Sequence, residues 1–273
     1  MNGVEHYENF PVASLLCPAR FRPPIAAIYH FARTADDIAD EGNASPTQRL
    51  ADLTAYRADL NAAIQGQAVS NRWPGVFAAL GPMLKQWQLP LPLLTDLLSA
   101  FEQDIVKTRY ADQAELLDYC RRSANPIGRL LLHLYGVKDA DALKQSDCIC
   151  TALQLVNFWQ DLSEDIPRGR IYLPADLQAK HAVTEAELLN QKISHNTRAL
   201  LADSVDWARQ LMRQGAPLVQ QVPGRAGWEL RLVVQGGLRI AERIEQLDFA
   251  TLQQRPVIGK RDALVMAWRT LWM

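Results

Sequence analysis

Two pairs of aspartates stand four residues apart in segments that are otherwise rich in apolar residues. Asp36 and Asp40 lie in YHFARTADDIADEG, and Asp161 and Asp165 lie in LQLVNFWQDLSEDIPRGRIYLP. Residues at this spacing project from one face of an α-helix, about one turn apart. Like charges at this spacing destabilise a helix, and burying them costs still more unless a cation neutralises them. The two pairs therefore predict a site for a cation.

Each acidic pair belongs to a longer polar stripe on a segment whose other positions are apolar. The first stripe contains Tyr29, Arg33, Asp36, Asp37 and Asp40, and the second contains Gln154, Asn157, Asp161 and Asp165. Both follow the period of an α-helix. Because apolar residues flank the stripes, we expect them to line an internal cavity. Two solvated acidic helix faces are the alternative interpretation.

The ligand types at this site indicate magnesium. Oxygen-only ligands select hard cations, and Mg²⁺ commonly binds substrate phosphates with only one or two carboxylates and several waters. A di-iron site would require Glu-x-x-His motifs, and the sequence contains none. Nearby basic residues suit a diphosphate bridged by the metal, although each one also suits a solvated surface; they are Arg33, Lys107, Arg109, Arg168 and Arg170. The sequence therefore predicts Mg²⁺ with a phosphate-bearing ligand.

The elements that would position these residues are all helical. Apolar residues recur with a helical period along most of the chain, and alternating β-branched runs are missing. We therefore predict an all-α fold, in one domain spanning 1–273. The expected helices are 24–41, 47–66, 73–88, 92–107, 112–134, 139–165, 184–195, 197–214, 225–247 and 259–271. Thr184 and Glu187 form a capping box, and the irregular stretch 166–183 is either a lid or a plain connection.

Composition restricts the class of function. The 273 residues carry a net charge of -1 and are 48% hydrophobic, so nothing favours nucleic acid as a partner. The four cysteines have no zinc spacing and are expected to be buried thiols. We identify neither a signal peptide nor a run of the roughly 18 apolar residues that a membrane span needs. The expected location is cytoplasmic.

Three motifs in the order of the chain resemble one known family. FARTADDIAD, YCRRSANPIGRL and LQLVNFWQDLSEDIPRGRIYLP are similar to motifs of the squalene and phytoene synthase family, and the similarity extends over about 5–245. The resemblance implies an isoprenoid synthase-type helical bundle around a central cavity. Within the family, ENFPVASLLCPARFRPPIAAIYHFARTADDIADEG most resembles the hydroxysqualene synthase branch of hopanoid biosynthesis.

The resemblance also implies roles for individual residues. It makes Asp36, Asp40, Asp161 and Asp165 the Mg²⁺ ligands, and it adds Tyr119 and Asn157 as catalytic groups. Substrate contacts are implied for His6, Arg33, Asp37, Gln154, Arg170 and Tyr172. Two positions depart from the family pattern. Many relatives carry arginine where this chain has Gln160, and many have a tyrosine on a late helix, whereas the last tyrosine here is Tyr172. Both departures weaken a simple transfer of the two-step condensing activity.

The reaction that the resemblance implies is Mg²⁺-dependent ionisation of presqualene diphosphate, with water capture to give hydroxysqualene and no redox cofactor. The alternative is a prenyltransferase that condenses two farnesyl diphosphates head to head, and a non-enzymatic interaction protein on the same fold is a third. Contact with other enzymes of the pathway is compatible with either reaction. A lipid substrate makes peripheral contact with the inner face of the membrane plausible, with Trp268 and Trp272 as candidates. We nevertheless expect the C-terminal helix to pack into the core.

Overall fold

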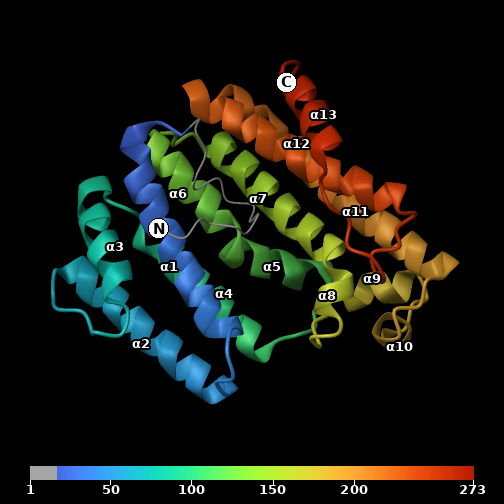
Figure 1. Cartoon of the computed structure of the whole chain (residues 1–273), viewed down its shortest axis with the longest axis horizontal. Coiled ribbons are helices and arrows are strands. Elements are labelled where there is room, and N and C mark those ends of the chain that lie inside the picture. The colour runs from blue at the N-terminus through green and yellow to red at the C-terminus, as the bar shows by residue number, and fades with distance from the viewer. Residues whose placement is uncertain (1–16) are drawn as a thin grey trace.

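The computed structural model describes residues 17–273, and every regular element in that range is helical (Figure 1). The predicted all-α class is therefore confirmed. The α-helices are α1 Arg22–Asp40, α2 Pro46–Gln65, α3 Pro74–Trp87, α4 Leu91–Val106, α5 Gln113–Ser123, α6 Asn125–Tyr135, α7 Ala140–Gln160, α8 Leu162–Asp165, α9 Ala175–Lys180, α10 Glu185–Leu189, α11 His195–Gly215, α12 Gly224–Gln246 and α13 Lys260–Thr270. Two 3₁₀ turns, Ala19–Phe21 and Ala216–Gln220, precede α1 and α12.

Local side chains fix where several helices begin. Ser45 accepts a hydrogen bond from the Gln48 backbone at 3.2 Å, ahead of Pro46 at the first position of α2. The predicted capping box of Thr184 and Glu187 is present at the start of α10. These caps satisfy backbone N–H groups that have no partner inside the helix.

Two expected helices are divided in the structure. The stretch 112–134 breaks at Ala124 into α5 and α6, because Pro126 has no N–H to continue the first helix. The stretch 139–165 breaks at Asp161, which separates α7 from the short α8. Nothing in the local residue types accounts for this second break. The Asp165 backbone still donates to the Asp161 carbonyl at 2.9 Å, so the two aspartates keep their one-turn relation.

The connection after α8 is well packed. It contains the unpredicted helix α9, and Ile171, Tyr172 and Leu173 are buried in it. The Ile171 backbone donates to the Thr108 carbonyl at 3.0 Å. The helix predicted over 184–195 is also shorter than expected, because α10 stops at Leu189 and α11 starts at His195. Since apolar side chains anchor this connection in the core, the lid interpretation is not supported.

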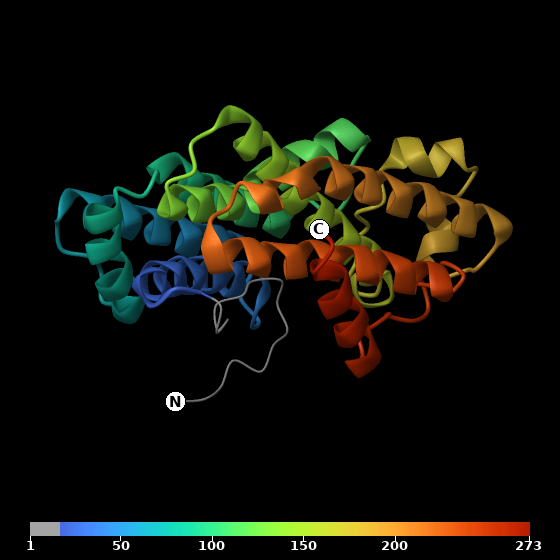
Figure 2. The ribbon, with the colours of Figure 1, turned by 90° about the horizontal axis from the view of Figure 1, so that it is seen from above.

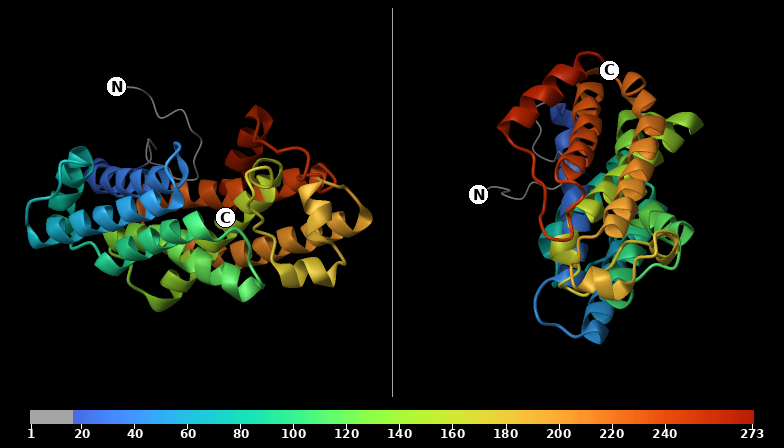
Figure 3. Two further views of the ribbon diagram at one scale, coloured as in Figure 1. Left: turned by 90° about the horizontal axis from the view of Figure 1, so that it is seen from below. Right: turned by 90° about the vertical axis from the view of Figure 1, so that its right-hand side faces the viewer.

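Helix α7 lies at the centre of the molecule and packs along α11 (Figure 1). Helices α1–α4 gather at one end, and α9 and α10 cover the other end (Figure 2). The long helix α12 packs on both α7 and α11, and α13 packs on α12 and projects from the body (Figure 3). This arrangement places α1 and α12 around the same side of the helices in the middle.

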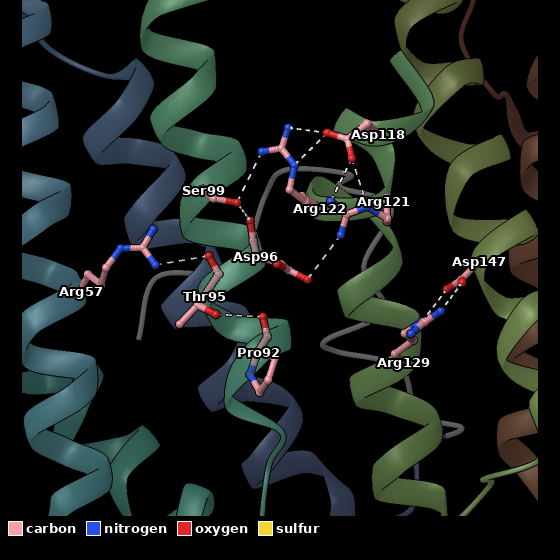
Figure 4. Close-up of polar contacts among 10 residues, drawn as sticks. All are labelled: Arg57, Pro92, Thr95, Asp96, Ser99, Asp118, Arg121, Arg122, Arg129 and Asp147. Carbon is pink, nitrogen blue, oxygen red and sulfur yellow. Dashed lines mark hydrogen bonds and ion pairs between the residues drawn. The ribbon is translucent and has the colours of Figure 1, made fainter. Parts of the chain in front are cut away.

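Ion pairs on α5 and α6 tie these helices to their neighbours (Figure 4). Arg122 of the YCRRSANPIGRL motif binds Asp118 and also donates to Gln103 of α4 at 2.6 Å. Arg129 of the same motif forms a bidentate pair with Asp147 of α7, with distances of 2.8 and 2.6 Å. Bidentate geometry orients both partners. These two arginines of the motif therefore tie α5 to α4 and α6 to α7.

Gly215 allows α11 to approach α7 closely. A Cβ at this position would lie 2.5 Å from the Gln145 carbonyl oxygen and 2.9 Å from the Ile149 nitrogen. We expect Gly215→Ala to lower the free energy of unfolding by about 1–3 kcal/mol, because backbone atoms must move to admit the methyl group. The matched control is Gly236→Ala, whose Cβ would make an ordinary contact with Met266; it should be neutral or stabilising by up to about 1 kcal/mol. Urea unfolding measures both, and equal effects would contradict this account of the helix contact.

No helix in the range 17–273 is long and apolar enough to cross a membrane.

The four cysteines are free thiols. Cys17 and Cys120 are buried, whereas Cys148 and Cys150 are half-buried. The expectation of buried thiols is thus confirmed for two of them.

Candidate active site

An apolar cavity of about 310 Å³ lies between α1, α6, α7 and α12. Ile127 of α6, Leu153 of α7 and Leu230 of α12 contribute to its wall, and Gln154 adds a polar group. A smaller pocket is lined by Tyr29, Arg33 and Asp36 of α1. The two share Ser123 and Ile127 as lining residues, so the apolar cavity adjoins the polar face of α1. Of the two predicted stripes, the α7 stripe therefore reaches the apolar cavity through Gln154, and the α1 stripe reaches the adjoining pocket. Asp40, Asn157, Asp161 and Asp165 line neither space.

The acidic face of α1 carries its own cation. The Arg33 guanidinium lies 2.8 Å from Asp37 and 3.5 Å from Asp36. All three side chains are partly exposed. This face is therefore at the mouth of the pocket, and it is more solvated than the apolar flanks of the stripe suggested.

Arg170 joins the two acidic motifs across 130 positions of sequence. Its guanidinium binds both carboxylate oxygens of Asp40, and the Nη1–Oδ2 distance is 2.8 Å. Arg170 follows α8, whereas Asp40 is the last residue of α1. The ends of the two motifs therefore meet, as a shared site for a phosphate and its metal requires. A paired, planar guanidinium of this kind also fits phosphate oxygens.

The second acidic pair lies at the break between α7 and α8. Burial raises the pKa of Asp161, and the neighbouring Arg255 guanidinium opposes that rise. Burial and then the charge of Asp161 raise the pKa of Asp165 to about 7. Both shifts arise first from burial, which disfavours the charged form of each carboxyl. A bound cation would reverse them.

The sequence interpretation missed Arg255. Its Nε lies 2.6 Å from Asp161 Oδ1 and 3.7 Å from Glu164, although it comes from the segment between α12 and α13. Pro256, which follows Arg255, accepts a hydrogen bond at its backbone carbonyl from the buried Gln160 side-chain amide, at 2.7 Å. Gln160 therefore fixes the segment that brings Arg255 to the acidic pair. A cation therefore stands beside Asp161 although the preceding residue, Gln160, is uncharged.

Asp104 of α4 is a second functional candidate that the sequence did not indicate. Tyr119 donates to its Oδ2 at 2.8 Å, and its buried Oδ1 has no hydrogen-bond partner in the described part of the chain. Burial raises the pKa of Asp104 to about 7, with Tyr119 and Arg170 opposing the rise. Burial and the Asp104 charge raise the pKa of Tyr119 well above its usual value. No spacing signal marks Asp104, because its partners come from other helices.

The raised pKa of Asp104 predicts a pH-dependent contribution to stability. Between about pH 4 and pH 7 the folded chain holds a proton on Asp104 that the unfolded chain has released, so this contribution is lost as the pH rises. Asp104→Asn carries no such proton. We therefore expect the melting temperature of the variant, relative to wild type, to rise by a few degrees between about pH 5 and pH 8. Calorimetry measures the difference, and one that is independent of pH would contradict the prediction.

Aromatic rings surround this acidic group. Tyr172 stacks on Phe158 with ring centroids 3.8 Å apart, and Tyr110 and Tyr119 lie against the same cluster. Burial raises the pKa of Tyr172 far above its usual range. Tyr119 and Tyr172, both predicted site residues, are thus brought together beside Asp104.

Other predicted residues have different positions. Asn157 is half-buried on α7, one turn before Asp161. Its backbone carbonyl accepts a hydrogen bond from the Asp161 backbone N–H at 3.0 Å. His6 lies outside the described residues. Lys107 pairs with Glu115, and Arg109 pairs with Glu185 at 2.8 Å, so both basic groups brace loops. Arg168 is exposed.

The carboxylates suit Mg²⁺ that also binds phosphate and water, and they do not suit a metal held by protein side chains alone. Among residues 17–273, no group of three or more His, Cys, Asp and Glu side chains converges on one point as a protein-only cage would require. Mg²⁺ instead retains waters and takes one or two carboxylates together with phosphate oxygens. Asp161 and Asp165 supply such a pair on one side, and Asp40 supplies a carboxylate on the other. The donors therefore suit Mg²⁺ that is shared with a diphosphate.

The fold and this site define a helical, isoprenoid synthase-type protein. Comparison with known proteins identifies its family. A model of the squalene/phytoene synthase family matches residues 4–262. A hydroxysqualene synthase of Sinorhizobium fredii is 34% identical over 244 residues, which are 89% of this chain and 80% of that protein. A presqualene diphosphate synthase of Rhodopseudomonas palustris is 32% identical over 186 residues, which are 68% and 64% of the two chains.

A solved structure supports the same placement. The crystal structure of squalene synthase HpnC from Alicyclobacillus acidocaldarius superposes with a TM-score of 0.82 and 35% identity, covering 89% of this chain and 90% of that one. The chain belongs to the squalene/phytoene synthase family. It is an enzyme of isoprenoid biosynthesis, and the expected similarity to hydroxysqualene synthases is confirmed.

Proposed function

We propose that this enzyme ionises presqualene diphosphate and captures the carbocation with water, releasing hydroxysqualene and diphosphate. The observation that carries the proposal is the Asp40–Arg170 pair, which joins the end of α1 to the segment that follows Asp161 and Asp165. The helices that carry the two acidic motifs, α1 and α7, also line the apolar cavity, through Ile25 and Gln154. The similarity to hydroxysqualene synthases supports this choice of reaction within the family.

The diphosphate group would bind at the charged end of the site. Asp36, Asp40, Asp161 and Asp165 would hold Mg²⁺, whose role when bound is to neutralise charge on the leaving diphosphate. Arg170 and Arg255 now bind these carboxylates. With those carboxylates engaged by Mg²⁺, both guanidiniums would be available to bind phosphate oxygens. Arg33 and Asp37 would complete this end from α1.

The prenyl chains would occupy the apolar cavity, where α6, α7 and α12 exclude bulk water. As the C–O bond to diphosphate breaks, its electron pair leaves with the phosphate and a carbocation remains. The oxygen of one water then forms a new C–O bond, and that water must lose a proton. We assign the proton to the Asp104 carboxylate, whose Oδ1 has no hydrogen-bond partner in the described part of the chain and whose Oδ2 is fixed by Tyr119. Gln154 and Asn157, which both lie on α7, would be further polar groups that orient the water.

The test is incubation of the purified protein with presqualene diphosphate and Mg²⁺, without a nicotinamide cofactor, followed by product identification. Hydroxysqualene that forms with Mg²⁺ and is absent after chelation supports the proposal. Presqualene diphosphate that forms from farnesyl diphosphate, with no product from presqualene diphosphate itself, would instead assign the condensing step.

The condensing prenyltransferase is the second candidate function. Similarity to a presqualene diphosphate synthase favours it, because the acidic motifs serve both reactions. The two expected departures from the family pattern, Gln160 and the lack of a tyrosine after Tyr172, weaken a simple transfer of the condensing activity to this chain. A non-enzymatic interaction protein has little support, since all four aspartates are present. We place the reaction in the cytoplasm, at the inner face of the membrane, because the substrate carries long apolar prenyl chains.

A further inference from the structure

Helix α13 turns its polar side toward the protein. Its buried residues are Asp262 and Thr270. Asp262 is bound by Arg239 at 2.6 Å and by Arg243 at 2.7 Å, both from α12, and Arg269 pairs with Glu242. Charged contacts with α12 therefore hold the helix in place, where apolar packing was expected.

The outer side of α13 is apolar. Leu264, Trp268, Leu271 and Trp272 are 74%, 62%, 58% and 76% exposed, and Val257 just before the helix is 63% exposed. The two indole rings lie 5.9 Å apart and form one patch. Five of the nine large apolar residues that are exposed in the described chain lie in this segment. The expectation that Trp268 and Trp272 pack into the core is therefore wrong, because the ion pairs with α12 turn them outward.

This arrangement is the reverse of an ordinary surface helix, which buries its apolar stripe. Large apolar patches on a protein surface mark sites that contact another apolar phase or molecule. Lys260 and Arg261, at the start of α13, are exposed, and no ion pair to either is found among residues 17–273. Since Asp262 is neutralised by two arginines of α12, the surroundings of the patch are positive.

We propose that the outer face of α13 binds the surface of an anionic lipid bilayer. Tryptophan and leucine on one face, with lysine and arginine at the edge, are the composition of helices that lie in the membrane interface. The charge of Lys260 and Arg261 complements anionic headgroups. A second copy of the chain would need a complementary groove, whereas a bilayer accepts a convex, projecting helix. The helix would lie on the membrane, consistent with the absence of a spanning helix in the described range.

The position of α13 connects this surface with the cavity. Helix α12, on which α13 is held, supplies Ala226, Leu230 and Val233 to the cavity wall. Figure 2 shows α13 projecting beyond α12 on the side of the molecule where α1 also lies. A bilayer that contacts α13 would thus face the part of the protein that surrounds the cavity. Binding to lipid itself needs no substrate, so this proposal can be tested independently of the reaction.

The experiment is co-sedimentation of the full chain with vesicles of phosphatidylcholine alone or mixed with phosphatidylglycerol. We expect binding to the mixed vesicles, reduced by roughly tenfold or more in the double variant Trp268→Ser, Trp272→Ser. The control is Leu117→Ser with Leu189→Ser, which removes two exposed apolar side chains from α5 and α10 and should leave binding unchanged. Lys260→Glu with Arg261→Glu should remove the preference for phosphatidylglycerol. Unfolding midpoints verify that each variant is folded.

Three outcomes would overturn the proposal. The first is that wild-type protein does not sediment with either vesicle. The second is that the tryptophan variant binds as well as the control variant. The third is that light scattering finds a wild-type dimer that becomes a monomer in the tryptophan variant, without any change in vesicle binding, since the occupant of the patch would then be a second copy of the chain.

Discussion

Asp161→Asn is expected to lower turnover of presqualene diphosphate by roughly a hundredfold or more while the fold is retained. The substitution removes the carboxylate at the turn between α7 and α8, where the neighbouring Asp165 can supply only one further charge. It also leaves Arg255 with a neutral amide oxygen in place of the carboxylate oxygen that it binds at 2.6 Å. Because burial already raises the pKa of Asp161, a neutral side chain is tolerated there, and stability should change little.

The matched control for this variant is Glu164→Gln. Glu164 lies on the same short helix and contacts the same arginine at 3.7 Å, but it is exposed and stands outside the four-residue spacing. Steady-state kinetics at saturating Mg²⁺ measures both variants, and thermal unfolding verifies the fold. Equal losses of activity in the two variants would assign the effect to general charge. Unchanged turnover in Asp161→Asn would remove this residue from the mechanism.

Arg170→Gln should cost about 2–5 kcal/mol of transition-state stabilisation, a loss in kcat/KM of roughly thirtyfold to several thousandfold. Arg170 binds both oxygens of Asp40, and it is the direct link between the segment after α8 and the end of α1. Its loss would separate the two motifs and remove a phosphate donor. Arg170→Lys keeps the charge but not the two-pronged geometry, so it should restore only part of the activity.

Arg168→Gln is the control for this position. Arg168 is two residues away, is exposed, and carries the same charge, so its replacement should change kcat/KM by less than about threefold. Binding of inorganic diphosphate with Mg²⁺, measured by calorimetry, separates a lost ligand contact from a slower chemical step. If Arg170→Gln retains wild-type kcat/KM and diphosphate affinity, the bridge between the motifs has no role in the reaction.

The sequence by itself determined the helical class, most helix positions and the acidic motifs. These features are local: apolar periodicity, prolines, caps and four-residue spacings all depend on residues within one or two turns. The break after α5 was not predicted, because the sequence interpretation placed one helix over 112–134 across Pro126. The spacing of Asp161 and Asp165 held even where α7 ends, because the hydrogen bond from Asp165 to Asp161 persists across the break.

Tertiary structure alone decided which charged groups meet. Arg255 reaches Asp161 across 94 positions of sequence, and Arg170 reaches Asp40 across 130. Asp104 gained its raised pKa from burial beside Tyr119, which no nearby residue specifies. The outward face of α13 likewise depends on arginines of α12 that bind Asp262. Long-range contacts of this kind follow from how helices pack, and a sequence records residue types without recording which of them become neighbours.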